Sequence, residues 1–101
     1  MRTRIVQSLN IDDETMRLLR EYHEYHGDGT VRCRGVVTLP TGGKMYLVHY
    51  HNERGIRCSS LDMIGYGADG PYATEMWSCE RPDEQDMLRE VFEGDEVYED
   101  D

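Results

Sequence analysis

The chain has 101 residues, of which 38% are hydrophobic and 32% charged, and its 21 acidic and 11 basic side chains give a net charge of −10. This length predicts one domain and excludes a separate catalytic and substrate domain. Because the chain has no signal-peptide pattern, no apolar run of 18 residues and only three widely spaced cysteines, we expect a cytoplasmic protein with reduced thiols and no membrane contact.

Two elements are predicted before residue 30. Residues 3–9 alternate imperfectly in polarity and are expected to form a first strand. Apolar residues recur near a 3.6-residue period over residues 11–26, which predicts an amphipathic helix. Asn10 or Asp12 can cap this helix and Gly27 can end it.

The middle of the chain predicts an antiparallel meander. Apolar residues alternate over residues 31–39, as in a strand with one buried face, and a tight turn at 40–43 leads to a return strand over 44–51. A second turn at 52–55 leads to a third strand over 56–60. The amphipathic helix is expected to cover the apolar face of this sheet.

The last third predicts a loop, a strand and a short helix. Residues 65–71 are rich in glycine and are expected to form the loop, and residues 72–79 fit a strand better than a helix. Pro82 opens the final helix and Gly94 ends it. The apolar stripe of this helix is Met87, Leu88, Val91 and Phe92.

Together these elements predict an α+β fold. It consists of a three- or four-stranded antiparallel sheet packed by one amphipathic helix, plus a short acidic C-terminal helix. Residues 1–94 are expected to form the single domain, and residues 95–101 an acidic tail.

The glycine-rich loop contains the pattern GxGxxG over residues 65–70. In dinucleotide-binding folds this pattern lets backbone amides approach a pyrophosphate between a strand and a helix. Here Pro71 follows at once, and no room remains for the parallel strand of such a unit. We therefore interpret the segment as a turn-forming loop.

The four histidines form two pairs. His23 and His26 are three residues apart on the predicted helix, and His49 and His51 are two residues apart on a predicted strand. Either spacing places two imidazoles on one face, as a transition metal requires. If the helix packs on the strand face of Met45 and Leu47, the two pairs could lie opposite each other. The alternative is that these are hydrogen-bonded histidines at the rim of the core.

No catalytic constellation is predicted, and we expect a protein that is not an enzyme and uses no cofactor. Cys33, between Arg32 and Arg34, is the best-placed cysteine nucleophile. Strand alternation sends both arginines to the face opposite its thiol, which favours a buried structural cysteine. The acidic residues lie in solvated runs in which no acid–base pair stands out.

A nucleic-acid-binding surface is a further alternative. Basic residues occur among Tyr46 and Tyr50, and arginines with aromatic rings on a sheet face can bind phosphates and bases. The net charge of −10 makes direct nucleic-acid binding unfavourable. The basic residues concerned are Arg32, Arg34, Lys44, Arg54 and Arg57.

Acidic side chains concentrate at the C-terminal end. Residues 73–101 hold twelve of the 21 acids and two arginines, a sum of −10, whereas residues 1–28 sum to −2 and residues 29–72 to +2. Carboxylates along a helix and tail can imitate a phosphate backbone and attract the basic groove of another protein. The alternative is an acidic end that only adds solubility.

The sequence therefore predicts a non-catalytic protein that binds and occludes a partner with a basic surface. Small acidic inhibitors carried by phages and mobile elements, including some anti-CRISPR and nuclease-blocking proteins, act in this way; the analogy is one of size and charge. An unpaired sheet edge and exposed tyrosines would also permit a homodimer. The predicted partner-binding residues are Asp83, Glu84, Asp86, Glu90, Glu93, Asp95, Glu96, Tyr46 and Tyr50.

Overall fold

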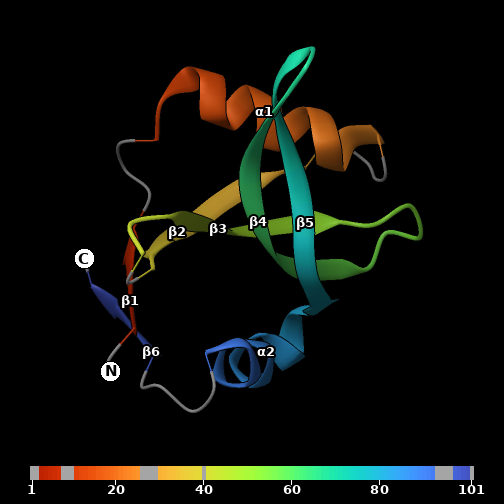
Figure 1. The fold of residues 1–101 in the computed structure, drawn as a ribbon. Coiled ribbons are helices and arrows are strands. Elements are labelled where there is room, and N and C mark those ends of the chain that lie inside the picture. Colours follow the sequence, from red (N-terminus) through yellow and green to blue (C-terminus); the bar gives the residue numbers. More distant parts are fainter. Residues whose placement is uncertain (1–2, 8–10, 26–29, 40, 93–96, 101) are drawn as a thin grey trace.

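The computed structural model contains one six-stranded sheet with a helix on each face (Figure 1). It describes residues 3–7, 11–25, 30–39, 41–92 and 97–100. In chain order its elements are β1 (Thr3–Gln7), α1 (Asp13–Tyr25), β2 (Arg32–Thr38), β3 (Lys44–His51), β4 (Arg57–Gly67), β5 (Gly70–Glu80), the 3₁₀ helix η1 (Arg81–Asp83), α2 (Glu84–Val91) and β6 (Val97–Asp100). The turn and cap predictions at Asn10, Gly27, Pro40 and Gly94 lie outside the described residues.

The predicted α+β fold is confirmed. Strands β2 to β5 form a four-stranded antiparallel meander in which each strand pairs with the next. The first strand, β1, adds antiparallel to β2, and β6 pairs parallel with β1, so the sheet order is β5-β4-β3-β2-β1-β6. β6 lies within the segment that was predicted as an acidic tail.

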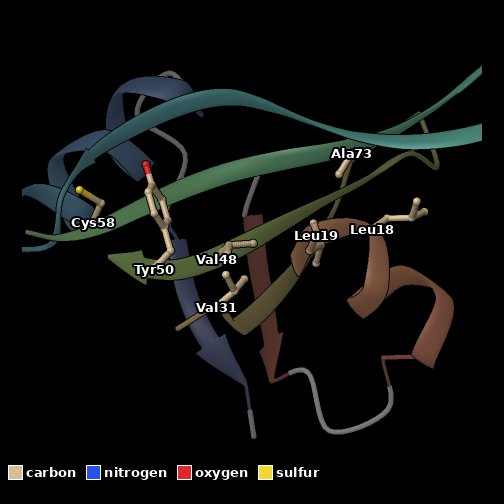
Figure 2. Close-up of a cluster of buried hydrophobic side chains, with 7 residues drawn as sticks. All are labelled: Leu18, Leu19, Val31, Val48, Tyr50, Cys58 and Ala73. Carbon is tan, nitrogen blue, oxygen red and sulfur yellow. The ribbon is translucent and has the colours of Figure 1, made fainter. Parts of the chain in front are cut away.

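The two helices pack on opposite faces of the sheet (Figure 1). The core under α1, here called the α1 core, is shown in Figure 2 and comprises Leu18, Leu19, Val31, Val48, Tyr50, Cys58 and Ala73. The core under α2, the α2 core, comprises Val37, Met45, Leu47, Leu61, Met87 and Leu88. Met45 and Leu47 therefore face α2, and the arrangement in which α1 packs on their face is wrong.

A bulge in β2 explains how one strand serves both cores. The β2–β3 register steps from Cys33 opposite Val48 to Gly35 opposite Leu47, which leaves Arg34 as an extra residue. Alternation predicted that residues 31–39 bury a single face. Instead Val31 belongs to the α1 core and Val37 to the α2 core, because the extra residue reverses the face.

Residues 65–71 do not form a loop, and that prediction is wrong. Gly65 to Gly67 end β4 and Gly70 begins β5, so the turn is only Ala68 and Asp69. Gly70 has φ of +104°, a conformation that glycine adopts at little cost. The ring of Tyr72 lies over Gly65, where an added Cβ would come within 2.6 Å of its Cζ. The ring of Tyr72 on β5 thus packs against Gly65 and Gly67 of β4, which have no side chains of their own to cover the strand.

The predicted helix starts are confirmed where the structure describes them. The carboxylate of Asp12 accepts a hydrogen bond from the Thr15 amide at 2.7 Å, as expected of the residue that caps α1. Met87 and Leu88 of the predicted apolar stripe are buried, and Pro82 lies in η1, which leads directly into α2 at Glu84. Residues 72–79 form part of β5, so the preference for a strand there is also confirmed.

Candidate functional site

Among the residues whose exposure the structure describes, the most exposed large apolar side chains all lie on the β4–β5 hairpin. The exposed fraction is 82% for Tyr66, 50% for Tyr72, 45% for Met76 and 44% for Trp77. Single exposed apolar residues are common, but four on one hairpin, including the only tryptophan, are unusual. Tryptophan and tyrosine are also the residue types that most often dominate binding energy at interfaces.

The strand register places two of these rings on the face of the sheet that α2 covers. Trp77 lies opposite Leu61, a member of the α2 core, and Tyr72 lies opposite Gly65. Leu61 and Gly65 are four residues apart on β4 and so share a face. Met76 precedes Trp77 at a bulge, where the β4–β5 register shifts. The exposed rings therefore continue the surface that starts at α2.

The carboxylates of η1 and α2 lie just beyond the end of β5, the strand that carries Tyr72, Met76 and Trp77. Asp83 belongs to η1, which directly follows β5, and Glu84 and Asp86 lie in the first turn of α2. Burial raises the pKa of the Cys79 thiol, and the charges of these three acids raise it further. Asp83 and Asp86 are exposed to solvent. We call the set Tyr72, Met76, Trp77, Asp83 and Asp86 the aromatic–acidic surface.

Glu84 differs from its acidic neighbours because its carboxylate is already engaged. Oε1 of Glu84 lies 2.5 Å from Nε2 of His49 and accepts a hydrogen bond from the Ser59 hydroxyl at 2.8 Å. Burial alone would raise the pKa of Glu84, but the hydrogen bonds from His49 and Ser59 outweigh it and hold the pKa below its usual value. Glu84 therefore fastens α2 to the sheet.

This anchoring predicts a pH dependence that can be assigned to one residue. A carboxyl whose pKa is lower in the folded than in the unfolded chain stabilises the fold at any pH above its unfolded-state pKa. This stabilisation is lost as the pH falls through the folded-state pKa. Between about pH 5 and pH 3, the free energy of unfolding is expected to fall more steeply for the wild type than for Glu84→Gln. Urea titrations along a pH series measure this. Glu90→Gln, on the exposed side of α2, is the control; parallel wild-type and Glu84→Gln curves would contradict the assignment.

The other predicted partner-binding residues differ in how exposed the structure shows them to be. Glu90 is exposed on α2, whereas Glu93, Asp95 and Glu96 lie outside the described residues. The expectation that both tyrosines of β3 are exposed is wrong. Tyr50 is buried in the α1 core (Figure 2), where its hydroxyl donates to Glu75 at 2.9 Å. Tyr46 is half-buried against the same core.

The histidines that the structure describes do not converge. His23 faces the α1 core, His49 binds Glu84 on the α2 side, and His51 hydrogen-bonds Thr30. His26 lies outside the described residues. Within the described ranges, no group of three or more histidine, cysteine or acidic side chains is arranged to hold a metal ion.

A buried polar network under α1 resembles a catalytic triad only in composition. Nε2 of His23 lies 2.6 Å from Oδ2 of Asp62 and 3.3 Å from the Ser60 hydroxyl. In a working triad the acid and the nucleophile contact different ring nitrogens, whereas here both contact the same one. All three side chains are at most 1% exposed, so no substrate reaches them. The ring centroids of Tyr50 and His23 are 4.2 Å apart, so the Tyr50 ring covers the imidazole.

The cysteines do not form a nucleophilic site either. Burial raises the pKa of Cys58, with a further increase from Glu80, and Cys79 is affected in the same direction, so neither thiol ionises readily. Cys33 is half-buried and its Sγ lies 3.5 Å from the Gly35 carbonyl oxygen. These contacts fit structural cysteines.

The basic residues do not form the expected sheet surface. Arg32 and Arg57 pair with the C-terminal half of β3, while Lys44 begins that strand at the opposite end. Tyr46 and Tyr50, the two tyrosines that this alternative grouped with the basic residues, pack against or in the α1 core. In the described part of the chain, the basic residues and the two tyrosines therefore do not share one exposed sheet face.

Comparison with known protein families, with curated proteins and with solved structures finds no match to this chain. Neither described helix combines the length and apolar content needed to cross a membrane. The chemistry of the molecule's own surface is therefore the basis for inferring its function.

Proposed function

We propose that this is a cytoplasmic, non-catalytic protein that docks on the basic, nucleic-acid-binding surface of another protein and occludes it. The observation that supports this function best is the aromatic–acidic surface on a chain with a net charge of −10. The rings supply apolar contact area and the carboxylates supply charge complementary to a basic groove.

The two parts of this surface have different roles in the proposed complex. The charge of −10 within residues 73–101 attracts a basic partner over about one Debye length, roughly 8–10 Å at physiological salt, and so raises the association rate. Trp77 and Tyr72 then bury their exposed surface against the partner and slow dissociation. Salt is therefore expected to weaken the complex without abolishing it.

Capture from bacterial cytosol, with identification by mass spectrometry, tests the proposal. The tagged wild type is expected to retain a basic nucleic-acid-binding protein at about 50 mM salt and to lose most of it near 500 mM. We then neutralise the acidic residues of η1, of α2 and of the segment after α2. This neutralised variant is expected to lose the partner at both salt concentrations. The substitutions are Asp83→Asn, Asp86→Asn, Glu90→Gln, Glu93→Gln, Asp95→Asn and Glu96→Gln.

A second variant tests whether the loss of negative charge elsewhere on the molecule has the same effect. Asp13→Asn, Glu24→Gln and Glu53→Gln remove three exposed charges outside both proposed contact surfaces, and capture is expected to persist. Purified partner then provides the functional readout, because the wild type is expected to displace DNA or RNA from it. Equal capture by the wild type and the neutralised variant would mean that the acidic end serves only solubility.

A further inference from the structure

A cleft of about 430 Å³ lies between α1 and the start of β5. This volume falls within the range of about 300–1,000 Å³ that is usual for ligand-binding pockets. Figure 1 shows α1 crossing the β4–β5 hairpin near its tip and continuing past β5. The residues that line the cleft are Arg17, Leu18, Glu21 and Tyr22 of α1, and Asp69, Pro71, Tyr72 and Ala73 of the hairpin.

Tyr72 is one of the residues that line this cleft. Its ring lies on the other face of the hairpin, over Gly65 and within 3.4 Å of the position that a Cβ on Gly67 would occupy. Ala73, the next residue, points the opposite way into the α1 core. The cleft is therefore lined by apolar side chains of the α1 core, Leu18 and Ala73, next to the first residues of strand β5.

That strand is an edge of the sheet. β5 has eleven residues and stands at the end of the strand order, and within the described residues it pairs only with β4. The amides and carbonyls on its outer side are a template for another strand. Pairing of an extended peptide with such an edge, beside a helix, is an established mode of peptide recognition.

The charges at the rim favour a basic occupant. Glu21 and Asp69 are exposed. The Arg17 guanidinium contacts the carboxylates of Glu14 at 2.7 Å and Glu21 at 2.8 Å, so these two acids outnumber the one arginine, and Asp69 adds a further negative charge. The net charge of −10 adds a long-range attraction for a positively charged segment and a repulsion for a second copy of this chain.

We propose that an extended segment of the partner, with arginine or lysine at alternate positions, adds to the edge of β5 as a further strand and lies in this cleft. The basic set of its alternate side chains faces α1, with the stems along Leu18 and Ala73 and the charged groups at Glu21 and Asp69, and the other set faces the opposite side of the sheet. This inference rests on the proposed function, since it names the part of the basic partner that docks beside the aromatic–acidic surface.

The test uses a synthetic peptide of about nine residues in which arginine alternates with valine. Binding is followed by NMR shifts and by hydrogen-exchange protection of the amides of residues 70–80. Two derivatives carry N-methyl groups on one or the other alternate set of residues, which removes donors while keeping charge and side chains. Because only one set of amides faces β5, one derivative is expected to lose binding and the other to keep it.

Protein variants test the charges at the rim. Glu21→Arg combined with Asp69→Lys is expected to weaken peptide binding about tenfold. Glu24→Arg, an exposed position on α1 outside the cleft, is the control and is expected to change it little. The variant with neutralised α2 acids is expected to keep the peptide, so failure here and failure of the proposed function are distinguishable.

Three results would overturn the inference. The first is the absence of any shift in β5 at about 1 mM peptide. The second is equal binding by both N-methylated derivatives, because it would show that no strand pairing occurs. The third is a protein dimer, measured by sedimentation without peptide, that already protects the β5 amides, because a second copy would then occupy the edge.

Discussion

Replacing Asp62 by alanine is expected to lower the free energy of unfolding by about 3–5 kcal/mol. Asp62 is fully buried, and its Oδ2 lies 2.6 Å from Nε2 of His23, which is 1% exposed. Truncation would leave His23 in the α1 core without this carboxylate. Urea unfolding followed by circular dichroism measures the loss.

A second substitution distinguishes a buried pair from simple loss of packing. Replacing both partners, in His23→Leu with Asp62→Val, is expected to recover much of the stability, because apolar side chains of similar volume need no charge partner. Oδ1 of Asp62 has no hydrogen-bond partner among the described residues, which adds to the cost of keeping the carboxylate buried. Removal of His23 alone is expected to be as harmful as removal of Asp62.

An exposed ion pair on the same helix provides the control. Glu21→Ala removes the contact with Arg17 at the surface and is expected to cost less than about 1 kcal/mol. If Asp62→Ala lowered the free energy of unfolding by no more than this, the contact between His23 and Asp62 would not be shielded from water, in contradiction to the structure.

Replacement of one leucine on each helix is expected to cost about 2–5 kcal/mol in each case. Leu19 of α1 has no exposed surface and Leu88 of α2 is 1% exposed, and they belong to different cores. Hydrogen exchange is expected to show that Leu19→Ala loosens α1 and Leu88→Ala loosens α2. This independence follows because the sheet separates the two cores.

The neighbouring arginines are matched controls for these two changes. Arg20→Ala and Arg89→Ala alter exposed positions one residue further along the same helices, and each is expected to change stability by less than about 0.5 kcal/mol. A loss of about 1 kcal/mol or less for Leu88→Ala would contradict the packing of α2 on the sheet. Loosening of both helices by either leucine variant would contradict the two separate cores.

Local patterns were sufficient to predict most of the elements. The 3.6-residue period over residues 11–26, the alternation in the middle of the chain and Pro82 each correspond to an observed helix, strand or helix start. These signals are local, since each depends on residues within one or two turns of one another. The α+β class follows from their order along the chain.

Features that depend on contacts between distant residues could not be predicted in this way. The bulge at Arg34 leaves no local signal, yet it reverses the face on which later residues of β2 are buried. The glycines of residues 65–70 indicate a loop until Tyr72 from the opposite strand covers them. Placement of α2 on the second face depends on Glu84 meeting His49, 35 positions earlier in the sequence.

The candidate site was predicted in part. Charge counting identified the acidic end, and two of its residues, Asp83 and Asp86, lie on the aromatic–acidic surface. The exposed rings were missed, because a strand sequence does not show whether a helix covers a given face. The only tryptophan of the chain, placed on a predicted strand among polar residues, was the signal that could have indicated them.

The dissociation constant of the captured partner for Trp77→Ala, compared with the wild type at one salt concentration, tests the central claim most directly. Trp77 is 44% exposed, so the variant is expected to fold normally. If the aromatic–acidic surface binds the partner, the dissociation constant is expected to rise by about 30-fold or more, as for a typical interface hot spot. An unchanged constant would show that the partner binds elsewhere and would contradict the account.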